Sequence, residues 1–190
     1  MTTLAGHILV AAPDLLDPNF RQTLVLIVQH GGDGALGLVL NRPTDTPLRD
    51  AWAQVSSSDC QADGLLHVGG PCQGPLMVVH QHADAGEIEI LPASTDMQLP
   101  QAQPGVHFST ESEKVQWIVE HNQREVKFFV GYAGWTAGQL ETEMKTGSWL
   151  VLPASVPLIF KTAPTDWKKL IRRLQAPVNP RIVPPDPSWN

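Results

Sequence analysis

The sequence is poor in cysteine and in long apolar runs, and each shortage excludes a class of protein. Cys60 and Cys72 are its two cysteines, fewer than a small disulfide-held secreted domain needs, so we favour free thiols in a reducing compartment. The longest apolar stretches, such as residues 24–28, are far shorter than the roughly 20 residues of a membrane-spanning helix. The first Lys or Arg is Arg21, so the N-terminal segment lacks the positive charge that begins a signal peptide. We therefore expect a cytoplasmic protein with no membrane association.

Signatures of familiar catalytic sites are missing too. The sequence has no nucleophile elbow, Walker loop or His-Glu-x-x-His motif. Gly32, Gly34 and Gly37 match the letters of the dinucleotide fingerprint, but an apolar strand-like run and Pro43 follow them. That fingerprint needs a helix to begin there, so we interpret the glycines as a hairpin turn. We expect no enzyme activity and no cofactor.

The composition is that of a globular protein, and its charged residues are unevenly distributed along the chain. Of 190 residues, 42% are apolar and 17% charged, typical of a folded protein. We expect one domain over residues 1–175 and a proline-rich tail over 176–190. Residues 1–160 contain 7 Lys and Arg against 17 Asp and Glu, whereas residues 161–190 contain 6 against 2. The acidic body disfavours direct binding of nucleic acid, because its carboxylates repel phosphate groups.

Short apolar runs dominate the chain and predict strands rather than regularly alternating helices. This pattern favours an α+β fold with a mixed, largely antiparallel sheet. The expected strands are Gly6–Ala12, Thr23–Val28, Ala35–Leu40, Leu65–Val68, Leu76–His80, Glu87–Leu91, Val106–Ser109, Val126–Val130, Trp149–Leu152 and Leu158–Phe160. Residues 92–105 are expected to form a loop.

Four segments have helical signals. Thr46-Pro47 is an expected helix start, followed by the apolar positions Leu48, Trp52 and Val55. Thr110 and Glu113 fit a capping box. Further helices are expected over Ala137–Met144 and over Asp166–Leu174, which is basic. The cations of this last helix form a solvated face or an interaction surface.

Two local patterns suggest binding residues. Arg42, between Asn41 and Pro43, ends a buried strand, and its guanidinium suits either an anionic ligand or the carbonyls of its own loops. Gly131–Trp135 is expected to be a tight loop that combines glycines with two aromatic rings. Each segment has both a structural and a binding interpretation.

A histidine cluster offers a different function. His80 and His82 would lie on one face of a strand, and His67 of a neighbouring strand could join them as a third zinc ligand. An unrecognised metal-dependent hydrolase is therefore the alternative to a binding protein. Neither a carboxylate nor a thiolate has diagnostic spacing beside these histidines.

Taken together, several blocks resemble the YqgE/AlgH family. They are Gly6–Pro13, Asp17–Phe20, Gly37–Pro43, Gly69–Pro71 with Val79-His80, and Gly131–Trp135 with Gly138–Glu141 and Trp149-Leu150. The resemblance covers roughly residues 4–160. Cys72 and Thr136-Ala137 depart from the usual pattern.

The resemblance implies a fold and leaves the activity open. Members of that family have a mixed sheet bent into a pseudo-barrel with flanking helices, no established enzymatic activity, and in some cases the label of transcriptional regulator. This chain has no helix-turn-helix signature, so regulation would be indirect, through an unknown small molecule or a protein.

We therefore expect a non-enzymatic binding or regulatory module in which three remote segments converge. Arg42 should lie within about 15 Å of Trp135, the span of a pocket. The candidate ligand- or partner-binding residues are Asn41, Arg42, Pro43, Gly69, Gly70, His80, Gly131, Tyr132, Gly134, Trp135, Gln139 and Glu141; no catalytic or metal-binding residue is assigned.

Overall fold

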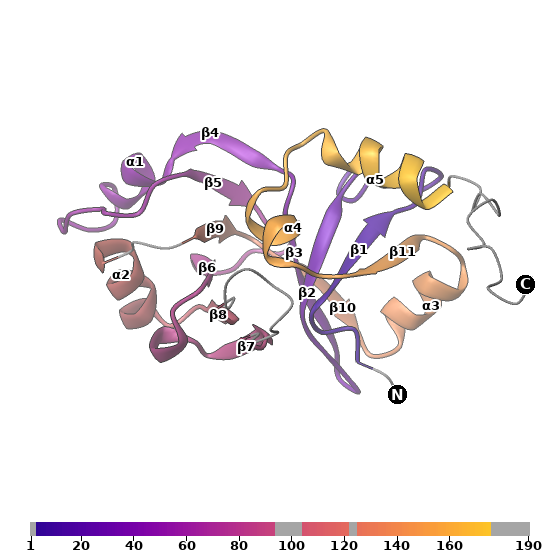
Figure 1. Ribbon diagram of the computed structural model, residues 1–190, viewed down its shortest axis with the longest axis horizontal. Coiled ribbons are helices and arrows are strands. Elements are labelled where there is room, and N and C mark those ends of the chain that lie inside the picture. The colour runs from indigo at the N-terminus through magenta and orange to yellow at the C-terminus, as the bar shows by residue number, and fades with distance from the viewer. Residues whose placement is uncertain (1–2, 94–103, 122–124, 176–190) are drawn as a thin grey trace, which may run out of the picture.

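Two β-sheets lie side by side in the computed structural model, with helices around them (Figure 1). The structure describes residues 3–93, 104–121 and 125–175. The proline-rich segment 176–190 and most of the loop expected at 92–105 lie outside these residues. The predicted α+β class is confirmed, with antiparallel pairing dominant. The strands form two separate sheets that do not close into a barrel.

The first sheet is built from the two ends of the described chain. Its strand order is β10-β3-β2-β1-β11, and every neighbouring pair is antiparallel. Residues 8–11 of β1 and 24–28 of β2 are all apolar and all buried, as expected of strands covered on both faces. The strands are β1 (His7–Ala11), β2 (Leu24–Gly31), β3 (Gly34–Val39), β10 (Ala133–Thr136) and β11 (Trp149–Pro153).

The second sheet is inserted in the sequence between β3 and β10. Its order is β4-β5-β9-β6-β8-β7, and β5 with β9 is its parallel pair. The strands are β4 (Pro43–Pro47), β5 (Leu65–Val68), β6 (Met77–His80), β7 (Ile88–Leu91), β8 (Val106–Ser109) and β9 (Val126–Val130).

The two sheets share a core, which fixes one against the other. Val79 and Phe129 of the second sheet are buried in the same cluster as Leu9 and Leu26 of the first. A second cluster lies under α1 (Leu48–Trp52) and α2 (Ser112–His121). The other helices are the 3-10 turn η1 (Ala83–Ala85), α3 (Gln139–Lys145), α4 (Val156–Phe160) and α5 (Asp166–Gln175). In the described part of the chain, no helix combines the length and the apolar composition needed to cross a bilayer.

Two predicted elements are wrong in type. The sequence predicts a strand over Leu158–Phe160, but these residues belong to the helix α4. Pro157 lies in the first turn of that helix, a position that favours proline. A run of three apolar residues has no periodicity that separates helix from strand. The expected loop Gly131–Trp135 becomes strand β10 from Ala133 onward, because it pairs with β3.

The helix starts also differ from prediction. Pro47 is the residue before α1, and no side chain caps the start of this helix. Val55 lies beyond the end of α1 and is exposed rather than part of an apolar face. The backbone N–H groups of Thr110 and Glu111 donate to Glu87, so a residue 23 positions away replaces the predicted capping box. Local sequence gives no signal for such a long-range cap.

Candidate functional site

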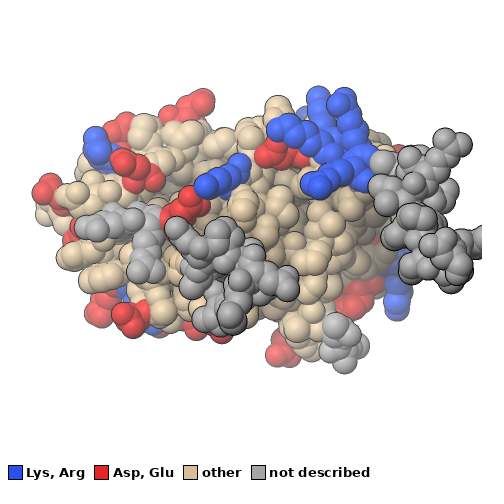
Figure 2. Space-filling model, in the orientation of Figure 1, with Lys and Arg blue, Asp and Glu red and all other residues tan. Residues whose placement is uncertain are grey.

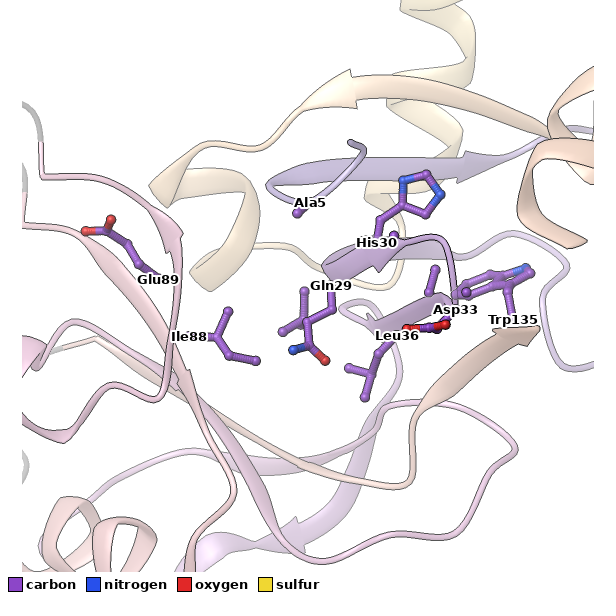
Figure 3. Close-up of a pocket in the computed structure, with 12 residues that line it drawn as sticks. Ala5, Gln29, His30, Asp33, Leu36, Ile88, Glu89 and Trp135 are labelled. Atoms are coloured by element: carbon purple, nitrogen blue, oxygen red, sulfur yellow. The ribbon is translucent and has the colours of Figure 1, made fainter. Parts of the chain in front are cut away.

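A groove of about 600 Å³ crosses the junction between the two sheets. The end of the β2–β3 hairpin forms most of its wall, Trp135 of β10 closes one end, and β7 of the other sheet contributes Ile88 and Glu89. Gln29, Leu36 and Ile88 point into the hollow from opposite sides (Figure 3). We call this the hairpin groove; both polar and apolar residues line it.

A bulge and a glycine shape the hairpin. The register between β2 and β3 shifts between Ile27 and Gln29, which leaves Val28 without an opposite residue and changes the strand's twist. Gly34 has a φ of 127°, and a Cβ there would lie 2.1 Å from the Trp135 carbonyl oxygen. Glycine therefore permits both the turn and the close approach of β10.

His30 joins the hairpin to two other segments. Its Nδ1 accepts the backbone N–H of Leu4 at 3.0 Å, and its Nε2 lies 3.1 Å from Oε1 of Glu141 on α3. Because Nδ1 accepts, it is the Nε2–H that donates to Glu141. The backbone N–H of Glu141 itself, and then His30, lower the pKa of the Glu141 carboxyl below its ordinary value.

Trp135 is fixed in place by a hydrogen bond and by packing against other aromatic rings. One oxygen of Glu143, Oε2, accepts the indole N–H groups of Trp135 at 2.9 Å and Trp149 at 2.8 Å. Phe20 stacks on Trp135 with a centroid separation of 5.9 Å and meets Trp149 edge-on at 5.6 Å. The Trp135 ring is thus a rigid end wall.

Gln139 and Glu141, the candidates on α3, have structural partners. Gln139 Oε1 accepts the backbone N–H of Thr136, and its Nε2 donates to Glu143. Glu141 is one hydrogen bond away from the hairpin groove through His30. Of the candidate residues, Trp135 is the one that lines the groove directly.

Asn41 and Arg42 bind backbone of the preceding loop. Asn41 is buried; its Oδ1 accepts the N–H of Leu24 and its Nδ2 donates to the carbonyl of Gln22, both at 2.9 Å. Arg42 donates to the carbonyl oxygen of Pro18 at 3.0 Å. Pro43 begins β4, opposite His67. These contacts agree with the structural interpretation of Arg42.

The glycine candidates bring two predicted segments together through their backbones. A Cβ on Gly69 would lie 2.2 Å from the carbonyl oxygen of Gly131, and one on Gly70 would lie 2.2 Å from the Tyr132 carbonyl carbon. Cys72 and Tyr132 exchange two backbone hydrogen bonds of 3.0 Å. A Cβ on Gly134 would lie 3.2 Å from the Tyr132 ring. The glycines therefore serve close packing where the sheets meet.

Segment 41–43 reaches the same junction. The N–H of Val68 donates to the Arg42 carbonyl, and the N–H of Val39 donates to Gly69. Phe20, which stacks on Trp135, lies in the loop that Arg42 binds. The three predicted segments thus adjoin one another, with their polar groups bonded to protein atoms.

His80 is fully buried in the second sheet and both of its ring nitrogens are used. Nδ1 accepts the N–H of His82, and Nε2 donates to Ser109, whose hydroxyl donates to the Ala85 carbonyl. Burial lowers the His80 pKa to about 3, so the ring is neutral. His67 instead bonds the carbonyl of Leu65. The described residues contain no group of three His, Cys, Asp or Glu placed to hold a metal ion, and both cysteines are free.

Sequence reasoning missed Gln29 and His30. They lie beside the glycine turn that was identified as a hairpin, and the polar His30 ending an apolar strand was the available signal. Ile88 was assigned to a strand, but its position across the groove depends on how the sheets pack.

Comparisons with known proteins agree on one family. The model of the AlgH-like family matches residues 8–179. A UPF0301 protein of Chlorobaculum tepidum is 35% identical over 82% of this chain and 78% of its own length. One from Azoarcus is 33% identical over 90% and 88%. The solution structure of the AlgH protein from Pseudomonas aeruginosa superposes with a TM-score of 0.65 at 30% identity, covering 94% of this chain and 91% of that one.

Proposed function

The chain belongs to the AlgH-like family, and from that premise we propose that it is a non-enzymatic cytoplasmic binding module whose ligand is a small molecule held in the hairpin groove. The names of its UPF0301 relatives assign no activity. Regulation by such a protein would be indirect: ligand occupancy would alter its contacts with another protein. The acidic body of the chain is a poor match for DNA.

The groove between the sheets is the observation that carries this proposal. Its volume of about 600 Å³ lies within the ~300–1,000 Å³ range of small-molecule sites. Leu36 and Ile88 offer apolar contact, while the exposed amide of Gln29 offers a donor and an acceptor. Trp135, which Glu143 and Phe20 hold in place and which is 5% exposed, closes one end of the groove. This chemistry suits a ligand with an apolar or aromatic body and a few hydrogen-bonding groups.

The alternative of a metal-dependent hydrolase has no comparable support. Its proposed ligand His80 uses both ring nitrogens in protein hydrogen bonds. His67 lies two strands away from it, since β9 separates β5 from β6.

A thermal-shift screen against nucleotides, amino acids and sugar phosphates tests the groove. A ligand present at about 100 times its Kd adds ~2.7 kcal/mol, which is roughly 5–10 °C for a domain of this size. Gln29→Trp, which fills the groove from an exposed strand position, should abolish that shift. Val68→Trp is the matched control, because Val68 is 39% exposed on a strand and lies outside the groove lining.

Arg42→Ala separates the groove from the other candidate residues. A ligand bound in the groove should still raise the melting temperature of this variant. A shift that disappears in Arg42→Ala and persists in Gln29→Trp would place the ligand on the Arg42 segment and refute the groove. No stabilisation by any compound in the screen would refute small-molecule binding as proposed.

A further inference from the structure

The molecule carries opposite charge on two remote surfaces. Segment 43–130, which builds the second sheet, α1 and α2, contains 12 Asp and Glu against four Lys and Arg. Helix α5 contains four Lys and Arg and one Asp. Figure 2 shows the basic side chains gathered over α5 and acidic ones spread over the opposite end. A second copy of the chain therefore offers each surface a partner of opposite charge.

The acidic end has a defined pocket that could receive a cationic side chain. This α2 pocket, of about 360 Å³, is lined by Asp84, Ala85, Glu113, Lys114 and Trp117. The Trp117 indole stacks on His121 and makes a T-shaped contact with His82, yet the side chain is 43% exposed, and the exposed part of an indole ring attracts ammonium and guanidinium groups. Lys114 is already paired with Glu111 at 3.1 Å. Within the described residues, Asp84 and Glu113 have no hydrogen-bond or ion-pair partner.

The basic helix presents cations in a position to enter such a pocket. Trp167 and Ile171 are buried against the first sheet, and the Trp167 N–H donates to the Ala11 carbonyl. Packing on this side orients the exposed Lys168, Arg172 and Arg173 away from the core. Lys169 is paired with Asp166 at 2.6 Å, which leaves those three as the available charges. We call them the α5 basic face.

We propose that the protein associates head to tail, with the α5 basic face of one copy docked on the α2 pocket of a second copy. The two surfaces are different parts of the chain, so the contact is heterologous and can extend into a ring or a chain of subunits. Net charge of −6 opposes association, but at about 0.1 M salt the Debye length is ~10 Å. At that range the local attraction between opposite patches outweighs the more distant repulsion.

The contact should be weak and sensitive to salt. A pocket of this size with three cations buries less surface than the ~1,200 Å² at the lower limit for stable specific interfaces. In sedimentation velocity at ~0.1 M salt, the average sedimentation coefficient of the full chain should rise with protein concentration. It should return to the monomer value at about 0.5 M salt.

Two charge-reversed variants provide the decisive test. Arg172→Glu/Arg173→Glu destroys the basic face and keeps the pocket; Asp84→Lys/Glu113→Lys destroys the pocket and keeps the face. Each variant alone should be monomeric. An equimolar mixture should associate again, because the intact pocket of the first variant meets the intact basic face of the second and the two reversed surfaces also carry opposite charge.

Controls separate this outcome from loss of folding or general charge effects. Lys145→Glu reverses an exposed cation on α3 that belongs to neither surface and should associate like the wild type. Circular dichroism must show both double variants folded. A mixture that stays monomeric, or a single variant that still self-associates, would overturn the proposal.

Discussion

The Glu143 carboxylate holds two buried tryptophans, and its removal should be among the most damaging changes to a surface helix of this protein. Oε2 accepts both indole N–H groups, from Trp135 and Trp149, which are 5% and 3% exposed. Glu143→Ala leaves two buried donors without an acceptor. Each unpaired donor costs about 1–3 kcal/mol, so the free energy of unfolding should fall by roughly 2–6 kcal/mol. The whole free energy of unfolding of a typical domain is about 5–15 kcal/mol.

Urea denaturation followed by tryptophan fluorescence measures this loss. A cycle with Trp135→Phe/Trp149→Phe isolates its cause: in that background both donors are gone, and Glu143→Ala should cost far less. Glu113→Ala, an exposed carboxylate on α2 without a partner in the described residues, is the control. A Glu143→Ala protein within about 0.5 kcal/mol of wild type, the usual range for surface changes, would refute the reasoning.

Three further predictions concern packing, buried polar groups and pH. Gly69→Ala should lower the free energy of unfolding by about 1–3 kcal/mol, because the new Cβ would lie 2.2 Å from the Gly131 carbonyl oxygen. Gly32→Ala should change it little, because no atom lies within 4 Å of a Cβ at that position. Equal urea midpoints for the two variants would contradict this. Asn41→Ala should cost about 1–3 kcal/mol by leaving the buried N–H of Leu24 unpaired, and slow exchange of that amide should be lost on NMR; unchanged exchange would refute the role. Burial lowers the pKa of His80 to about 3 and that of His67 to about 4, so below pH ~6.5 the unfolded chain binds protons that the folded chain does not. The contribution of these two histidines to the free energy of unfolding is therefore complete above pH ~6.5 and decreases as the pH falls toward 4. His80→Gln should make the free energy of unfolding less dependent on pH between 6.5 and 4; an unchanged pH dependence would count against this explanation.

The strands were predictable where burial on both faces leaves a continuous apolar run. β1 and β2 follow directly from such runs, as does the glycine hairpin that joins β2 to β3. β4 was missed because Pro43–Pro47 consists of turn-forming residues, which an edge strand tolerates. The division into two sheets was not predictable, because the parallel pairing of β5 with β9 joins segments some 60 residues apart.

The candidate site was predictable in part for a similar reason. Glycines at 69, 70 and 131 signalled close backbone approach, and the structure brings those segments into contact. Whether Arg42 binds a ligand or the carbonyls of its own loop depends on where the 17–22 loop lies, which no local pattern specifies. The groove exists because β7 packs beside the β2–β3 hairpin, a result of sheet packing alone.

The insertion of one sheet inside the other has a consequence for synthesis of the chain. On the ribosome, β1, β2 and β3 are made first, yet the strands that complete their sheet, β10 and β11, begin only at Ala133 and Trp149. Until then both outer strands of the nascent three-stranded sheet expose unpaired backbone groups, which invite pairing with other chains. A ribosome that stalls before residue 149 would therefore release an aggregation-prone fragment, and efficient production of this protein should depend on rapid translation of its last third or on a chaperone that covers those edges.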